Sequence, residues 1–220
     1  MAKVDSQKMT DVPLPAIFVA GALALDFLNS LATPADVPVE WLASGEALVN
    51  WLGQAELVPD DALQALVFKA VPGELDAVAG QARALREWFR GFVHKYRGKA
   101  LSHAALKKLE PLNRILFRDE RFGQIVLNKS KTTDGESRTF AWEEIRRWRS
   151  SESLLIPIAE SMANLVCNED FTYVKACQGH ACTLLFIDRT RRRARRWCSM
   201  TVCGNRAKQA AFRTRGSIVK

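Results

Sequence analysis

Long apolar runs are missing from this sequence of 220 residues. No stretch of about 18 consecutive apolar residues occurs, so we expect no transmembrane helix. The segment from Met1 to Val12 is polar and lacks the apolar centre of a secretory signal peptide. We therefore expect a cytoplasmic protein whose residues 1–12 form a flexible tail.

Residues that often carry catalysis are also scarce. The chain has only three histidines, at positions 94, 103 and 180, and neither an HExxH nor a GxSxG motif. The pattern from Gly91 to Lys99 places too many residues between its glycines for a phosphate-binding loop. We therefore do not expect an enzyme.

Acidic residues are nearly absent from the last quarter of the chain. From Phe171 to Lys220 there are twelve Lys and Arg but one acid, Asp188, whereas the rest of the chain has 20 basic and 23 acidic residues. The net charge of +8 therefore comes from this quarter alone. Such asymmetry favours a polyanionic partner, with a solvated basic surface as the alternative.

Cysteine is absent from the first three quarters, and all five cysteines follow: Cys167, Cys177, Cys182, Cys198 and Cys203. An odd number argues against a disulfide framework. The last four have the spacing C-x4-C-x15-C-x4-C, in which two short-spaced pairs can surround one tetrahedral ion. Thiolate ligands favour zinc, so we predict one structural zinc ion held by these four residues.

Two alternatives to this ligand set remain open. The four thiols could be buried without a metal, or His180 could replace Cys182 as a ligand. Cys167 lies outside both pairs, and we expect it to be a buried thiol on a helix. A zinc ion with four thiolates has no open coordination position, which also disfavours metal catalysis.

Apolar periodicity predicts an α+β fold that is mainly helical, with an N-terminal domain over residues 13–168. We expect helices within 17–31, after Ser44, after Asp60 with Leu63, Leu66 and Val67 inward, over 73–96, after Ser102 as far as Pro111, and after Ser153. One β-hairpin is predicted from strands at 122–127 and 138–142, joined by a turn at Asp134-Gly135. In the apolar segment 17–31, Asp26 and Asn29 could line a pocket or form hydrogen bonds within the core.

Residues 172–216 predict a small treble-clef-like zinc finger. Thr183–Ile187 reads as a strand, Arg196–Ser199 as the segment that returns beside it, and Gly204-Asn205 as the start of a helix with Ala207, Ala210 and Ala211 inward. So short a segment with few large apolar residues would not fold without metal. We therefore expect chelation to unfold the finger and to spare the N-terminal domain.

At these residues the sequence resembles a known family. The run RRWCSMTVCGNRAK, from Arg195 to Lys208, with the upstream cysteines and the segment 186–188, is similar to the CGNR zinc-finger proteins. The segment LALDFLNSL, from Leu23 to Leu31, resembles the start of the ABATE domain that precedes this finger, and RALREWFRGF and LLIPIAESMANLV also fit that domain. Ser30 stands where Thr is common. The resemblance implies a bacterial, stress-induced transcriptional regulator whose finger binds zinc and DNA.

Basic side chains of the finger are the candidate nucleic-acid contacts: Arg189, Arg191, Arg192, Arg193, Arg195, Arg196, Arg206, Lys208, Arg213 and Arg215. Arginine suits phosphate because it offers paired donors and stays charged. Some of these cations, such as Arg195, Arg196 or Lys208, could instead offset the charge of the zinc–thiolate centre. Asp188 is expected to orient an arginine, and Trp197 to be finger core or a base-stacking surface.

These features predict a zinc-dependent DNA-binding transcriptional regulator, with the N-terminal domain serving for sensing of a small-molecule effector or for homodimerisation. The alternative is an RNA-binding or protein-interaction module with a purely structural zinc finger. Neutralisation of about six phosphates would give a slope near −5 in a plot of log affinity against log salt, at about −0.9 per contact, whereas a flat dependence would favour the protein-interaction module.

Overall fold

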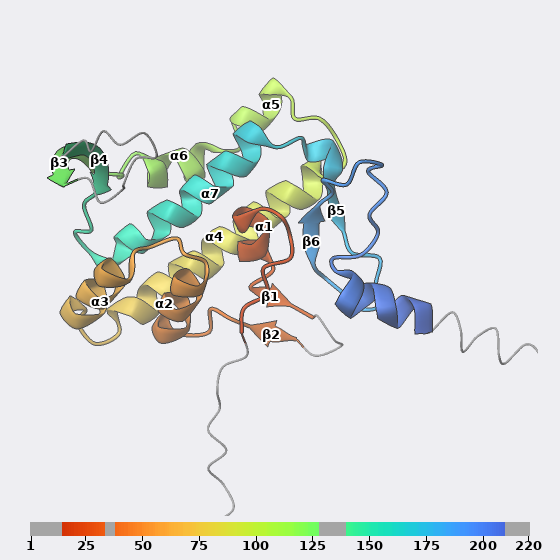
Figure 1. The fold of residues 1–220 in the computed structure, drawn as a ribbon, viewed down its shortest axis with the longest axis horizontal. Coiled ribbons are helices and arrows are strands. Elements are labelled where there is room, and N and C mark those ends of the chain that lie inside the picture. The colour runs from red at the N-terminus through yellow and green to blue at the C-terminus, as the bar shows by residue number, and fades with distance from the viewer. Residues whose placement is uncertain (1–14, 34–37, 128–139, 210–220) are drawn as a thin grey trace, which may run out of the picture.

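A computed structural model describes residues 15–33, 38–127 and 140–209. Helices dominate, accompanied by three two-stranded antiparallel sheets (Figure 1). The predicted α+β, mainly helical class is confirmed. The predicted tail at residues 1–12, the turn at Asp134-Gly135, Ala210, Ala211, Arg213 and Arg215 lie outside the described residues.

The long helix α4, Glu74–Tyr96, is the principal support of the N-terminal domain. Its apolar residues recur every three or four positions, and the buried ones include Val78, Ala82, Leu85, Phe89 and Phe92. Gly73 precedes the helix with a φ of 82°, a left-handed conformation that glycine adopts without strain. The predicted helix over 73–96 is thus confirmed.

Helix α1, Leu23–Leu28, is shorter than the apolar run suggests, yet it contacts α4, helix α7 (Leu155–Asn168) and strand β6 (Leu185–Ile187). Asp26 accepts the backbone N–H groups of Val19 and Ala20, both at 2.9 Å, which holds the preceding chain outside the helix. After α1 the chain enters β1 (Leu31–Ala32), which pairs with β2 (Val39–Glu40). The apolar run 17–31 therefore contains a loop, a helix and a strand.

The remaining helices of the domain are α2 (Gly45–Gln54), α3 (Asp60–Lys69), α5 (His103–Leu106) and α6 (Glu110–Leu116). Ser44 caps α2 as predicted, since its hydroxyl accepts the Ala47 N–H at 3.2 Å. Pro111 does not end α5, which stops at Leu106; it lies in the first turn of α6, where proline is tolerated. The inward orientation predicted for Val67 is wrong, because that side chain is 46% exposed.

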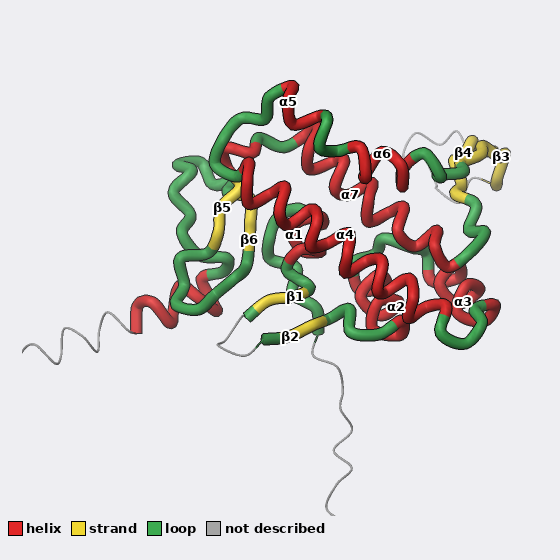
Figure 2. The backbone as a smooth tube through the Cα atoms, turned by 180° about the vertical axis from the view of Figure 1, so that it is seen from behind, coloured by secondary structure: helices red, strands yellow, loops and turns green. Residues whose placement is uncertain are grey.

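The predicted hairpin is confirmed as β3 (Arg121–Leu127) paired with β4 (Phe140–Arg146). It lies at one end of the molecule, and the third sheet lies at the other (Figure 2). Two short 3-10 helices, Ser151–Leu154 and Phe171–Tyr173, flank α7. Among the described residues, no helix combines the length and the apolar character needed to cross a membrane.

In the finger, β6 pairs with β5, Val174–Ala176, and not with Arg196–Ser199. The prediction of a returning strand at 196–199 is wrong: this segment has no strand structure, although the carbonyl of Arg196 accepts the Gln178 N–H at 2.9 Å. The partner strand comes from residues before the first cysteine pair. A single π-helical turn, Met200–Gly204, leads into helical residues 205–209.

The finger and the helical domain share one hydrophobic core. Buried Phe186 and Leu185 of the finger belong to the same cluster as Phe27 and Leu28 of α1. Strand β6 lies beside α1 in both views (Figures 1 and 2). The finger is thus packed into the fold and is not an appended module.

Candidate zinc centre and basic loop

The four cysteines predicted as ligands meet at one point. The sulfur atoms of Cys177, Cys182, Cys198 and Cys203 all lie within 4.8 Å of one another. The Cys182–Cys198 and Cys198–Cys203 sulfur distances are 3.9 and 3.6 Å. A tetrahedral zinc ion with Zn–S bonds of about 2.3 Å requires sulfur atoms about 3.8 Å apart, so the residues fit one zinc ion.

Backbone and side-chain donors surround the sulfur atoms. Cys177 Sγ accepts the N–H groups of Gly179 at 3.4 Å and of Cys198 at 3.3 Å. Arg206 places Nη2 3.5 Å from Cys203 Sγ. Such donors orient thiolates and offset their negative charge. Arg195, Arg196 or Lys208 was predicted to offset this charge, and the structure adds Arg206.

The crowding of the thiols opposes the ionisation of Cys198 and Cys203. A hydrogen bond from Cys198 lowers the pKa of Cys182 to about 5. The same contact, together with burial, raises the pKa of the Cys198 thiol far above its usual range. Burial, together with the hydrogen bond to Cys182, raises the pKa of Cys203 to about 11. A multivalent cation between the sulfur atoms would favour the thiolate forms of Cys198 and Cys203 and so offset this crowding.

Gly179 is part of the centre, although it was not predicted from the sequence. A Cβ atom at this position would lie 2.9 Å from Cys203 Sγ and 3.3 Å from Cys182 Cβ. Glycine thus allows the first knuckle to pass close to the second pair of cysteines. Its position between Cys177 and Cys182 was the available signal, since glycine in a tight metal knuckle often marks a close approach.

The other metal-ligand candidates lie elsewhere. His180 is exposed and does not belong to the four-sulfur cluster, which answers the alternative of His180 in place of Cys182. Cys167 is on α7 and exposed, so its predicted burial is wrong. It lies near the C-terminal end of α7, where the apolar stripe of the helix faces away from it.

Asp188 holds the start and the end of the basic loop, which we define as residues 189–196. This fully buried carboxylate accepts Lys175 Nζ at 2.7 Å, the Arg195 N–H at 2.8 Å, and both donors of Thr190 at 3.0 and 2.6 Å. Burial alone would raise its pKa, but these partners hold the pKa well below its usual range. Asp188 therefore orients a lysine and the loop backbone, whereas an arginine side chain was predicted.

Two arginines of the basic loop make contacts that stabilise the fold. The guanidinium of Arg195 donates to the carbonyls of Val19 at 3.0 Å, Trp197 at 2.9 Å and Cys198, and lies 4.3 Å from the ring centre of Phe186. It thereby links the helical domain to the second cysteine pair. Arg193 donates to the Asp188 carbonyl and lies 4.0 Å from the ring centre of Tyr173.

Arg189 and Arg196 have protein partners but remain exposed. Arg189 forms an ion pair with Glu169, just after α7, and its side chain is 57% exposed. Arg196 donates to Gln178 at 2.7 Å and lies 5.1 Å from the ring centre of Trp197. Trp197 itself is half-buried and packs against the core. This agrees with its predicted core role more than with an open stacking surface.

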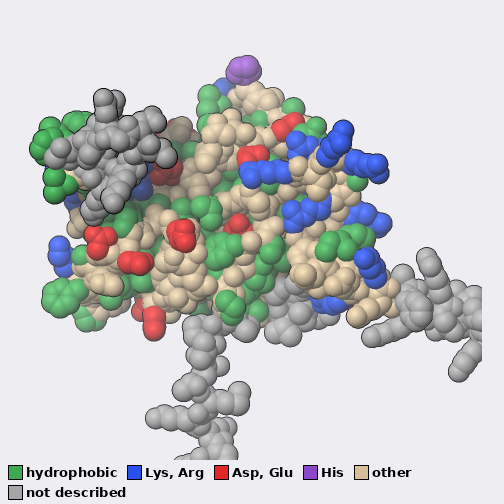
Figure 3. Space-filling view, viewed as in Figure 1, with side chains coloured by type: hydrophobic (Ala, Val, Ile, Leu, Met, Phe, Trp, Pro, Cys, Tyr) green, Lys and Arg blue, Asp and Glu red, His purple; other side chains and the backbone are tan. Residues whose placement is uncertain are grey.

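Arg191, Arg192 and Lys208 are exposed, and no ion pair or hydrogen bond is found for their side chains within residues 15–33, 38–127 and 140–209. Lysine and arginine side chains gather over the finger end of the molecule, seen at the right of Figure 3. The structure thus divides the predicted basic set into side chains engaged in the fold and side chains available to a ligand.

Asn29 of α1 joins the helical domain to the finger. Its amide nitrogen donates to the Leu185 carbonyl at 2.9 Å, and its amide oxygen accepts the Leu185 N–H at 2.8 Å. The Ile187 N–H donates to the Ala20 carbonyl at 2.8 Å in the segment held by Asp26. Asp26 and Asn29 therefore make structural hydrogen bonds, and neither lines the pocket described next.

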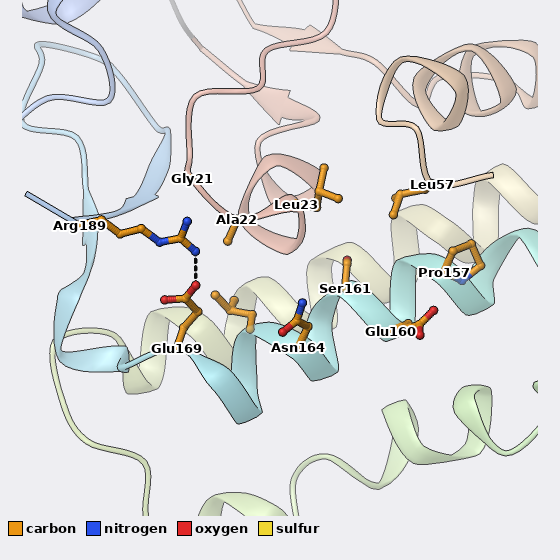
Figure 4. A pocket seen from close by; sticks show the side chains of 11 residues that line it. Gly21, Ala22, Leu23, Leu57, Pro157, Glu160, Ser161, Asn164, Glu169 and Arg189 are labelled. Carbon is orange, nitrogen blue, oxygen red and sulfur yellow. Dashed lines mark hydrogen bonds and ion pairs between the residues drawn. The ribbon is translucent and has the colours of Figure 1, made fainter. Parts of the chain in front are cut away.

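A pocket of about 430 Å³ lies where α1, α7 and the finger meet (Figure 4). Apolar side chains of Leu23, Leu57 and Leu165 line it together with Ser161 and Asn164. The Arg189–Glu169 ion pair forms its border toward the finger. A molecule in this pocket would touch both the helical domain and the first residue of the basic loop.

Comparison with known families gives two matches. The profile of ABATE, described as a "putative stress-induced transcription regulator", matches residues 21–169. The profile of the CGNR zinc finger matches residues 173–216. No match is found among curated proteins. The four clustered cysteines are therefore those of a zinc finger that holds one structural zinc ion.

Proposed function

Because the chain belongs to the ABATE family and carries a CGNR zinc finger, we propose that it is a zinc-dependent transcriptional regulator that binds DNA through its finger. The observation that carries this proposal is a set of exposed cations, Arg191, Arg192 and Lys208, whose side chains form no ion pair or hydrogen bond with the part of the chain that the structure describes. They lie on a scaffold fixed by four cysteines. Exposed guanidinium groups on a rigid support suit phosphate contacts.

The proposal includes a non-enzymatic role in a reducing compartment such as the cytoplasm. Four thiolates fill the coordination positions of a tetrahedral zinc ion, which leaves no position for a substrate or water. Thiolate ligation also requires reduced cysteines. The zinc ion then stabilises the fold of the finger, and the arginines bind the nucleic acid.

The structure refines which basic residues to test. Arg191 and Arg192 are the first choice, since removing them disturbs no described contact. Arg195 is a poor probe, because its loss would break the contacts to Val19 and Cys198. The matched control removes the same charge elsewhere: Lys69→Ala with Arg114→Ala, on exposed positions of α3 and α6.

The test is a titration of zinc-loaded protein into labelled duplex DNA, single-stranded DNA and RNA over a salt series, repeated after chelation. We expect metal-dependent duplex binding whose salt slope falls by about 2 in the Arg191→Ala/Arg192→Ala variant, at about −0.9 per phosphate contact. The control pair should keep the wild-type slope. Absence of binding to every nucleic acid at low salt would contradict the proposal.

The alternative is an RNA-binding or protein-interaction module with a purely structural finger. The same titration separates these two modules. A preference for single-stranded RNA would favour the RNA-binding module, and a flat salt dependence would favour the protein-interaction module. The exposed arginines favour nucleic acid over a protein partner.

For the helical domain, we propose sensing through the pocket beside Arg189. Its partly apolar lining suits a small organic effector, and its volume lies within the usual range of ligand sites. An effector that displaces Glu169 from Arg189 would change the charge presented by the basic loop. Ser161→Trp would fill the pocket; it should abolish any effector response while DNA affinity without effector stays at the wild-type value.

A further inference from the structure

One face of the β3–β4 hairpin is an exposed apolar surface. The strand register places Ile125 opposite Trp142 and Leu127 opposite Phe140. Directly opposed residues project to the same side of a sheet, so these four side chains form one surface, here called the hairpin face. Their exposed fractions are 73%, 73%, 67% and 64%, respectively.

The hairpin face is held in a fixed shape. The indole of Trp142 lies across Gly123, where a Cβ atom would come within 1.7 Å of Trp142 Cζ2. At the base of the hairpin, Arg146 pairs with Asp119 at 2.7 Å and with Glu160 at 2.8 Å. The ring therefore presents a flat apolar surface instead of moving freely.

An isolated two-stranded hairpin is marginally stable in water, and contiguous apolar patches on proteins usually mark interaction sites. The opposite side of this hairpin carries half-buried Val126, Ala141 and Ile145, turned away from the hairpin face, together with exposed Gln124 and Glu143. The hairpin thus has an apolar residue on each side of the ribbon, and one side lacks cover among the described residues.

We propose that the hairpin face is a homodimer interface, packed against the same face of a second copy of this chain. None of its four side chains is charged. The charged residues on the same side of the ribbon, Arg121, Glu144 and Arg146, lie at its base, where both arginines are paired with acids of their own chain. These four side chains therefore favour a partner surface that is also apolar. Its own copy is such a surface, related by the two-fold symmetry of most dimers.

The available area suits a dimer. Each buried aromatic side chain removes about 150–250 Å² from water, so the two aromatic residues with Ile125 and Leu127 supply a large part of the about 800 Å² per partner in a standard interface. The hairpin lies at the end of the molecule away from the finger (Figure 1), so both basic loops stay accessible. The interface is separate from the proposed DNA site and goes beyond that function.

The test measures the mass of zinc-loaded full-length protein by sedimentation equilibrium without nucleic acid. We expect twice the chain mass of 24.6 kDa. Ile125→Ser with Trp142→Ser should give a monomer that retains zinc and helical content. Phe68→Ser is the control: this side chain is 90% exposed on α3, and its loss should leave the dimer intact.

A second pair of variants separates loss of the interface from loss of the fold. Phe140→Glu and Phe140→Lys should each be monomeric, because each puts charges of one sign into both halves of the interface, and a mixture of the two should form a 1:1 dimer. A monomeric wild type at about 100 µM, or a dimer that persists in the hairpin variants, would overturn the proposal. DNA binding enters none of these readouts, so the two proposals fail independently.

Discussion

Gly179 sets how closely the two cysteine pairs approach each other. Gly179→Ala would bring a methyl group within 2.9 Å of Cys203 Sγ, and the rigid knuckle leaves it little room. We expect the zinc affinity to fall about ten-fold or more, in line with other residues that support metal ligands. Competition with a chromophoric chelator measures the change.

The matched control for this variant is Gly91→Ala. Gly91 lies inside α4, and a Cβ atom there would meet no described atom within 4 Å. Alanine also favours a helix over glycine, so zinc affinity should stay the same and stability should rise slightly. Equal zinc affinity in both variants would contradict the role given to Gly179.

Single residues also illustrate what could and could not be predicted from the sequence. The cysteine spacing predicted four residues that the structure brings together, because a tetrahedral ion imposes that local pattern. Asp188 could be recognised only as the lone acid of its segment. Its partners Lys175 and Arg195 lie on either side along the chain, and side-chain hydrogen bonds leave no periodic signal.

At the scale of elements, α1 depends on a buried carboxylate. Burial raises the pKa of Asp26 to about 6 from its usual 3.8, although the N–H groups of Ala20 and Val19 partly oppose this. The folded state therefore binds the proton more tightly than the unfolded state. The stability that this proton supplies is complete below about pH 4 and is lost as the pH rises through 6.

Asp26→Asn removes the buried charge and keeps an oxygen that can accept both N–H groups. A shift of this size corresponds to about 3 kcal/mol, of which about 1.4 kcal/mol falls between pH 5 and 8. We expect the variant to gain stability relative to wild type by that amount over this pH interval. Urea unfolding of both proteins at each pH measures it, and a difference that does not vary with pH would refute the assignment.

Elements with a regular apolar pattern were predicted well, and pairings between distant segments were not. Helices α2 and α4 follow from periodicity and from the Ser44 cap. The partner of β6 was misassigned, because β5 lies before the first cysteine pair and its three residues carry no strand pattern of their own. The buried Arg86–Glu40 ion pair at 2.6 Å likewise joins α4 to β2 without any local signal.

At the scale of the whole molecule, the shared core changes the expected effect of metal removal. The sequence suggested that chelation would unfold the finger and spare the helical domain. The structure joins Asn29 of α1 to Leu185 by two hydrogen bonds and places both segments in one hydrophobic cluster. Loss of the finger would therefore uncover one side of α1.

We expect chelation to raise amide hydrogen exchange in β5, β6 and α1. Helix α3 is the internal control, because its hydrophobic residues Ala62, Leu63 and Leu66 pack with α2 and not with the finger, so its exchange should stay close to that of the zinc-loaded protein. Mass spectrometry of peptides covering these segments gives the readout. If the amides of α1 stay protected from exchange after the finger has lost its metal, the helical domain is stable without a folded finger.

The bond between Asn29 and Leu185 spans 156 residues, which has a consequence for synthesis of the chain. At about 5–20 residues per second, a ribosome needs about 8 to 30 seconds after making α1 before it makes the strand that covers it. A nascent chain halted before the finger keeps an open apolar surface, which marks it for chaperones and proteases. Chains that end before the finger would therefore be degraded, and the helical domain would not accumulate without its zinc centre.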